Sequence, residues 1–213
     1  MMGLPVAFAA SLLLGMRHAT DADHVVAVST IVSREKSLVR AGSIGVIWGL
    51  GHTLTIFGVG GAIVLFKWSV SPRVGLSLEF SVALMLVVLG LLSLAPHTHA
   101  TVAASRLKPF VVGVVHGLAG SAGATLLIVP LIDDPRWAVA YLVVFAVGSI
   151  AGMALVTFAV AAPAVLAASR VGAMQRGLRL AAGAISLGFG LYLGYQVGFV
   201  DGLFTVDPHW APR

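Results

Sequence analysis

The sequence predicts an all-α integral membrane protein in which six transmembrane helices form two inverted three-helix repeats. Hydrophobic residues make up 59% of the 213 positions and charged residues only 10%, whereas about 25% of residues are charged in a soluble domain. Apolar runs of about 20 residues, the length of a membrane-crossing helix, recur along the chain. The chain has no cysteine, so any bound metal would be held by nitrogen and oxygen atoms.

Six apolar spans cover most of the chain, and we expect residues 1–213 to form a single membrane domain. The expected spans are residues 3–32, 43–66, 76–95, 109–132, 137–164 and 178–200. Short segments with turn residues and charges separate them. The first span is longer than a crossing needs and contains several ionisable residues, which predicts a kink or break there. It lacks a basic leading region, so we expect it to be a retained helix and not a cleaved signal peptide.

The Lys and Arg residues of the loops predict the orientation. Eight lie in the odd-numbered loops and four on the opposite side: Arg34, Lys36, Arg40, Arg106, Lys108, Arg170, Arg176 and Arg179, against Lys67, Arg73, Arg136 and Arg213. The positive-inside rule places the odd-numbered loops in the cytoplasm and both termini outside. Because these basic residues act as topology determinants, the net charge of +5 does not indicate nucleic-acid binding.

The two halves of the chain share landmarks in the same order, which predicts repeats at residues 1–95 and 109–200. His18-Ala19 corresponds to His116-Gly117, Trp48-x-x-Gly51-His52 to Phe145-x-x-Gly148-Ser149, and Leu78, Gly90 and Leu91 to Leu178, Gly190 and Leu191. Three spans per repeat is an odd number, so the second copy must enter the membrane from the opposite side. Transporters with this architecture bind substrate near the midplane at the repeat interface.

The ionisable residues of the first span lie in the stretch Arg17-His18-Ala19-Thr20-Asp21-Ala22-Asp23-His24. A buried charge costs about 2.5–3.5 kcal/mol on membrane-insertion scales, so such residues mark substrate paths or pair with one another. Two imidazoles and two carboxylates also suit a divalent metal. In a continuous helix His18, Asp21 and His24 share an arc of about 120° while Asp23 points elsewhere. A broken helix would let Asp23 join them.

Two further histidines are candidate metal ligands. In the second span, His52 lies roughly 13–15 Å from the cytoplasmic end, and Asp21 and His24 lie roughly 12–16 Å from that end of the first span, so we expect the three to meet at one depth. His116, in the fourth span, corresponds to His18 in the repeat and would line the other wall of a path. The run of small residues that follows His116, rich in glycine and with Ser121, also fits close helix packing, so a structural role stays open for this histidine.

Two alternatives involve packing or pairing. Arg17 could pair with Asp21 or Asp23, leaving the histidines to hydrogen-bond within the bundle. In the sixth span, small residues recur every four positions, which indicates a helix-packing ridge and a candidate homodimer face. The ridge consists of Ala182, Ser186, Gly190, Gly194 and Gly198.

The motif His18-x-x-x-x-Asp23-His24 resembles the signature of the nickel/cobalt transporter family, and Leu50-Gly51-His52-Thr53 is similar to that family's second motif. The later acidic motifs of its eight-span members are absent. His-Gly-Leu-Ala-Gly-Ser-Ala, at 116–122, resembles instead the shorter urease-accessory H-type, nickel-permease-like branch. The resemblance implies nickel or cobalt import, with His18, Asp23, His24 and His52 as motif residues.

We therefore expect a non-enzymatic permease that moves Ni²⁺ or Co²⁺ as substrate across the cytoplasmic membrane and carries no prosthetic group. The metal set is His18, Asp21, Asp23, His24, His52 and His116. Because imidazoles must be neutral to ligate, metal binding should weaken as the pH falls. Alternatives are an efflux carrier, an intramembrane metalloenzyme, and a non-transporting accessory protein that serves a metallochaperone in nickel-enzyme maturation.

Overall fold

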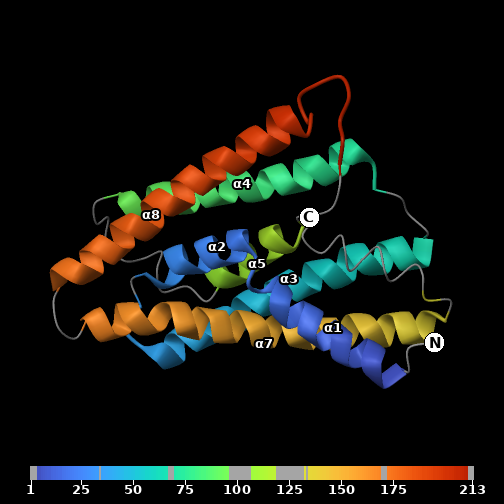
Figure 1. Cartoon of the computed structure of the whole chain (residues 1–213), viewed down its shortest axis with the longest axis horizontal. Helices are drawn as coiled ribbons and strands as arrows, with labels where there is room; N and C mark the ends of the chain where they lie inside the picture. The colour runs from blue at the N-terminus through green and yellow to red at the C-terminus, as the bar shows by residue number, and fades with distance from the viewer. Residues whose placement is uncertain are drawn as a thin grey trace.

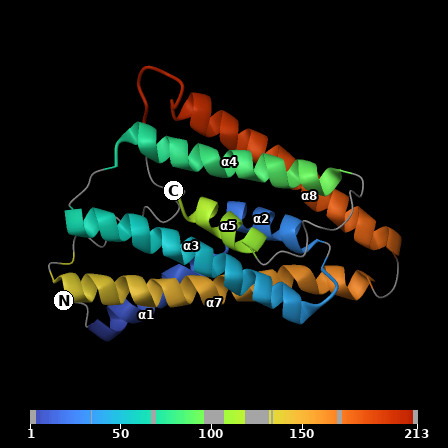
Figure 2. The ribbon, with the colours of Figure 1, turned by 180° about the vertical axis from the view of Figure 1, so that it is seen from behind.

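The computed structural model describes residues 4–33, 35–66, 70–95, 107–118, 132, 134–168 and 172–210, and within them every regular element is helical. The elements are α1 (Leu4–His18), α2 (Ala22–Val32), α3 (Leu38–Phe66), α4 (Pro72–Leu94), α5 (Leu107–Gly117), α7 (Pro135–Ala168), α8 (Gly172–Tyr195) and the short π-helix η3 (Gln196–Val200). Figures 1 and 2 show α4 and α8 as one layer, α3, α7 and α1 as another, and the short helices α2 and α5 between them.

Four helices are long and apolar enough to cross a membrane: Leu38–Ala62, Pro72–Leu94, Arg136–Pro163 and Met174–Val200. They agree with the second, third, fifth and sixth expected spans. Of the fourth expected span the structure describes α5, up to Gly117, and Leu118 and Ile132. The remainder of that span lies outside the described residues, so the expected six-span architecture stays a prediction.

The first expected span is broken, as its length and polar residues predicted. Helix α1 ends at His18, and α2 starts at Ala22. Between them the chain turns: the Thr20 amide donates to the Arg17 carbonyl at 2.8 Å and the Asp21 amide to the His18 carbonyl at 3.1 Å. Asp21 is the N-cap residue of α2 but makes no side-chain cap hydrogen bond, because its carboxylate contacts His18 instead.

Glycines let two helix pairs pack with their backbones in contact. A Cβ added to Gly15 of α1 would lie 2.8 Å from the Ser149 nitrogen of α7, and one added to Gly113 of α5 would lie 2.9 Å from the His52 nitrogen of α3. A Cβ contact under 3.0 Å forces the backbone to shift, so neither position accepts a side chain without moving a helix. These contacts fix α1 on α7 and α5 on α3, and so set the positions of His18 and His116.

The ridge of small residues on α8 packs against α4 of the same chain. Ser186 is fully buried and its hydroxyl donates to the Leu86 carbonyl at 2.8 Å. A Cβ on Gly190 would lie 2.8 Å from the Val87 nitrogen, and one on Gly90 would lie 2.6 Å from the Leu187 nitrogen. The expectation of a packing ridge is therefore correct, but its assignment as a homodimer face is wrong for Ser186, Gly190 and Gly194, which α4 of the same chain already covers.

Candidate metal site

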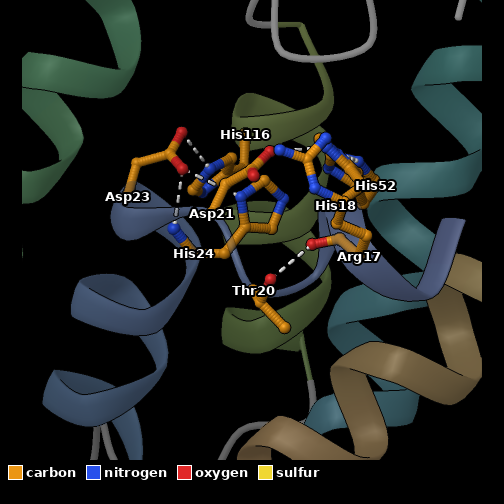
Figure 3. A network of polar contacts seen from close by, with 8 residues as sticks. All are labelled: Arg17, His18, Thr20, Asp21, Asp23, His24, His52 and His116. Atoms are coloured by element: carbon orange, nitrogen blue, oxygen red, sulfur yellow. Dashed lines mark hydrogen bonds and ion pairs between the residues drawn. The ribbon is translucent and has the colours of Figure 1, made fainter. Parts of the chain in front are cut away.

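Four histidines from four helices meet between the two layers. His18 is the last residue of α1, His24 lies in the first turn of α2, His52 is in the middle of α3, and His116 lies at the end of α5. His24, His52 and His116 are fully buried, and His18 is 6% exposed. The ring centroids of His24 and His116 are 4.0 Å apart, and those of His18 and His24 are 4.5 Å apart. The rings form one continuous cluster (Figure 3).

On one side of the cluster His18 joins Asp21 to His52. His18 Nδ1 lies 2.9 Å from Asp21 Oδ2, and His18 Nε2 lies 2.9 Å from His52 Nε2. A carboxylate accepts, so the proton of His18 is on Nδ1 and its Nε2 presents a lone pair toward His52. Such a carboxylate fixes the tautomer and the orientation of an imidazole, a common arrangement behind metal-ligating histidines.

On the other side Asp23 joins His24 to His116 (Figure 3). Asp23 Oδ1 accepts from the His24 backbone amide at 2.9 Å and from His24 Nδ1 at 3.0 Å. Asp23 Oδ2 accepts from His116 Nε2 at 2.9 Å. The Asp23 side chain is 18% exposed, so the carboxylate lies at the accessible edge of an otherwise buried group.

Ring nitrogens within the cluster lack hydrogen-bond partners. They are His24 Nε2, His52 Nδ1 and His116 Nδ1. A buried polar atom without a partner is costly, and each one in a native protein calls for an explanation such as a ligand. Among the described residues two sets offer ligand atoms within 4.8 Å of one another: His18, His24 and His52, and Asp23, His24 and His116. These residue types suit a divalent transition metal.

The ends of two helices favour a cation here. Helices α1 and α5 end at His18 and Gly117, next to the cluster. The C-terminus of a helix carries a partial negative charge equivalent to about half an electron. Helix α2 begins at the same place, and its opposite partial charge is offset by Asp21 and Asp23 in and beside its first turn. The backbone and the two carboxylates therefore make the site attractive to positive charge.

The structure brings the six predicted residues to one place but gives them different positions. Asp23 belongs to one of the two ligand sets, as expected for a broken helix, whereas Asp21 contacts His18 from behind and belongs to neither. Asp21 is 42% exposed at its side chain. Both aspartates pair with histidines, while the Arg17 side chain is exposed.

Two aromatic residues at the site were treated in the sequence only as landmarks of the repeat. The Trp48 ring centroid lies 5.4 Å from that of His24 and 5.6 Å from that of His116. The Phe145 ring lies 5.9 Å from that of His18. Trp48 and Phe145 are buried and exclude water from the imidazoles. The one-turn spacing from Trp48 to His52 is the signal that could have found the tryptophan.

The fold and the site define an all-helical protein of the membrane type with a buried histidine and aspartate cluster. The chain is 34% identical over 212 residues to the urease accessory protein UreH of Bacillus sp. (strain TB-90), in an alignment covering 91% of this chain and 92% of the relative. It therefore belongs to the family of that protein, in agreement with the urease-accessory resemblance. No family model matches the chain, and no solved structure matches it.

Proposed function

We propose that this protein is a secondary carrier that moves Ni²⁺, with Co²⁺ as the close competitor, through the His/Asp cluster. The observation that carries the proposal is the meeting of four buried histidines from α1, α2, α3 and α5, with Asp23 between two of them. A buried ionisable residue in a membrane segment is a functional-site hypothesis by default. The urease connection in the name of the relative favours nickel among the metals that imidazole accepts.

The spacing of the ring nitrogens supports ion binding. Metal–nitrogen bonds of about 2.0–2.1 Å place two nitrogens on one ion roughly 2.9–3.3 Å apart, depending on the bond angle. The 2.9 Å between His18 Nε2 and His52 Nε2 falls within this range. An ion could therefore replace the hydrogen bond between these two rings with little movement of either helix, when the His52 proton moves from Nε2 to Nδ1, which has no partner.

Reciprocal contacts support the two inverted repeats that we propose for the carrier. Gly15 packs on Ser149, and Gly113 packs on His52. In the repeat Gly15 corresponds to Gly113 and Ser149 corresponds to His52, so the two contacts are equivalent. Gly90 lies on Leu187 and Gly190 lies on Val87, again as matched pairs. An exchange of partners of this kind is expected where a pseudo-two-fold axis relates one repeat to the other, as in inverted repeats.

The same symmetry relation includes the site. The Phe145 ring beside His18 corresponds to the Trp48 ring beside His116. His52 and Ser149 are counterparts, and both are fully buried. We propose that the ion loses part of its water shell at this cluster and that rocking of one repeat against the other changes the side to which the cluster opens.

We place the carrier in the cytoplasmic membrane as a six-span protein with its odd-numbered loops in the cytoplasm. The four long apolar helices support the membrane location, and the distribution of Lys and Arg supports the orientation. Cysteine accessibility mapping would test it: a cysteine at Ser37, in the first loop, should react with a membrane-impermeant reagent only in inside-out vesicles.

Uptake of ⁶³Ni²⁺ in a host deficient in nickel import tests the function. We expect accumulation with the wild-type chain and its loss in His18→Ala and His52→Ala, with His209→Ala as the control, because His209 is exposed. Unchanged accumulation in both site variants would disprove the site assignment. Accumulation below that of the empty vector would indicate export.

A non-transporting accessory role is the second candidate, favoured by the name of the relative. Such a protein would hold nickel at the same cluster and pass it to a metallochaperone. Purified protein that binds Ni²⁺ in liposomes but gives no flux would favour this role over the carrier.

A further inference from the structure

His24 belongs to both sets of ligand atoms, the set with His18 and His52 and the set with Asp23 and His116. Its Nδ1 faces Asp23, whose other oxygen contacts His116. Its Nε2 is buried and has no partner. The rings of His18 and His52 lie on edge to that of His24, with centroids 4.5 and 5.1 Å away. His24 therefore stands between an Asp23/His116 side and a His18/His52 side.

The two sides differ in chemistry and in burial. The Asp23 side offers a carboxylate and imidazoles, and the Asp23 side chain is 18% exposed. The His18 side offers three imidazoles that are at most 6% exposed. A hydrated divalent cation is attracted first to a charged, accessible oxygen, whereas an all-nitrogen set suits a transition metal that has lost water.

We propose that the cluster holds one ion at a time in either of two positions, and that the ion passes from one to the other across the His24 ring. This relay rests on the proposed function. The outer position consists of Asp23, His24 and His116, and the inner position of His18, His24 and His52. Because both positions use His24, an ion at one withdraws a ligand from the other, and two divalent ions so close together in a buried site would repel strongly.

The relay explains two features that a single undivided site leaves unexplained. His24 is the only member of both ligand sets found among the described residues. Asp21 orients His18 of the inner position, and Asp23 accepts from both His24 and His116 of the outer position. Each position thus has a carboxylate that fixes an imidazole, and the Asp23 carboxylate also serves as a ligand at the outer one.

Metal binding by the purified full chain in nanodiscs tests the relay, with Co²⁺ as an absorbing probe and Ni²⁺ for X-ray absorption. We expect one ion per chain in the wild type. His116→Ala should retain an ion with nitrogen ligands from the protein only, and His52→Ala an ion with mixed oxygen and nitrogen ligands. Each single variant should bind about 10- to 100-fold more weakly than the wild type, and the double variant should lose binding.

Two ions per wild-type chain would overturn the relay. So would identical spectra of the two single variants, or complete loss of binding in each, because both results describe one undivided site. If either alanine variant fails to fold, His52→Phe and His116→Phe give the same comparison, because phenylalanine keeps a ring but offers no ligand atom. Flux measured in liposomes separates the two proposals: two spectra without flux contradict the carrier alone, and flux with a single spectrum contradicts the relay alone.

Discussion

Two regions of this protein bury polar groups within apolar helices, and they treat those groups differently. Between α4 and α8, Ser186 donates to the Leu86 carbonyl and the Arg179 guanidinium donates to the Ser93 carbonyl. At the His/Asp cluster, buried nitrogens of His24, His52 and His116 have no partner. The first region satisfies its polar groups within the fold, as a packing interface must. The second leaves ring nitrogens without hydrogen-bond partners, as the proposed metal site requires.

The comparison also separates two uses of glycine. Gly90 and Gly190 bring α4 and α8 together where no ionisable side chain of the cluster lies. Gly15 and Gly113 bring α1 and α5 against α7 and α3, and each lies three residues before a site histidine. The glycine contacts of α1 and α5 therefore position the histidines of the cluster, whereas those between α4 and α8 only join the two helices.

The largest expected effect is that of His24→Ala, because this residue belongs to both ligand sets. We expect Ni²⁺ affinity to fall by about 100-fold or more. Removing a residue that only orients a ligand costs about 10- to 100-fold, and removing the ligand itself should cost at least as much. Isothermal titration of the purified chain measures it, with the exposed His209→Ala as the matched control. Affinity within a factor of three of the control would exclude His24 as a ligand.

Asp21→Asn tests orientation without removing a ligand atom. An amide can present its NH₂ group to His18 Nδ1, which favours the wrong tautomer, so we expect a loss of about 10- to 100-fold in Ni²⁺ affinity. The thermal unfolding midpoint should hardly change, because the Asp21 side chain is 42% exposed. A large fall in that midpoint with unchanged affinity would show that Asp21 serves the fold and not the site.

Gly113→Ala tests whether the packing of α5 on α3 positions the cluster. The new methyl group would meet backbone atoms of Trp48 and His52, and overpacking of this kind costs about 1–3 kcal/mol. We expect a lower unfolding midpoint together with weaker Ni²⁺ binding. Gly58→Ala, in α3, is the control, because a Cβ there has nothing within 4 Å. A lower unfolding midpoint with unchanged Ni²⁺ affinity would show that the Gly113 contact stabilises the fold but does not position the cluster.

Ser186→Ala should have the smallest effect. The hydroxyl makes one hydrogen bond to a backbone carbonyl, and such bonds between membrane helices contribute about 0.6 kcal/mol on average. We expect a slight loss of stability and unchanged Ni²⁺ binding and uptake. A clear loss of metal affinity would contradict the separation of the two regions.

The sequence could predict much of the site because its constraints are local. The excess length of the first span and its ionisable residues predicted the break between His18 and Ala22. The rise per residue of two helices predicted that His52 and His24 can meet at one depth. The correspondence of His116 with His18 placed His116 on the facing wall.

Other features depend on contacts between distant segments. The α8 ridge was recognisable as a packing surface, but its spacing does not specify the partner, and α4 of the same chain covers it. The sequence identified Trp48 and Phe145 only as matching positions of the repeat. Their contacts with His24, His116 and His18 depend on how α3 and α7 cross the shorter helices.

The sequence by itself determined that this is an apolar helical protein with histidines and aspartates inside its spans, because composition and spacing alone restrict what a helix in lipid can be. Only the tertiary structure gave the two aspartates different positions. A straight helix would place Asp21 on the same face as His18 and His24 and would turn Asp23 away. With the turn at Ala19 and Thr20, Asp21 contacts His18 from behind, while Asp23 reaches His116, 93 positions away in the sequence. A contact across that separation depends on the packing of α2 and α5, which no local pattern specifies.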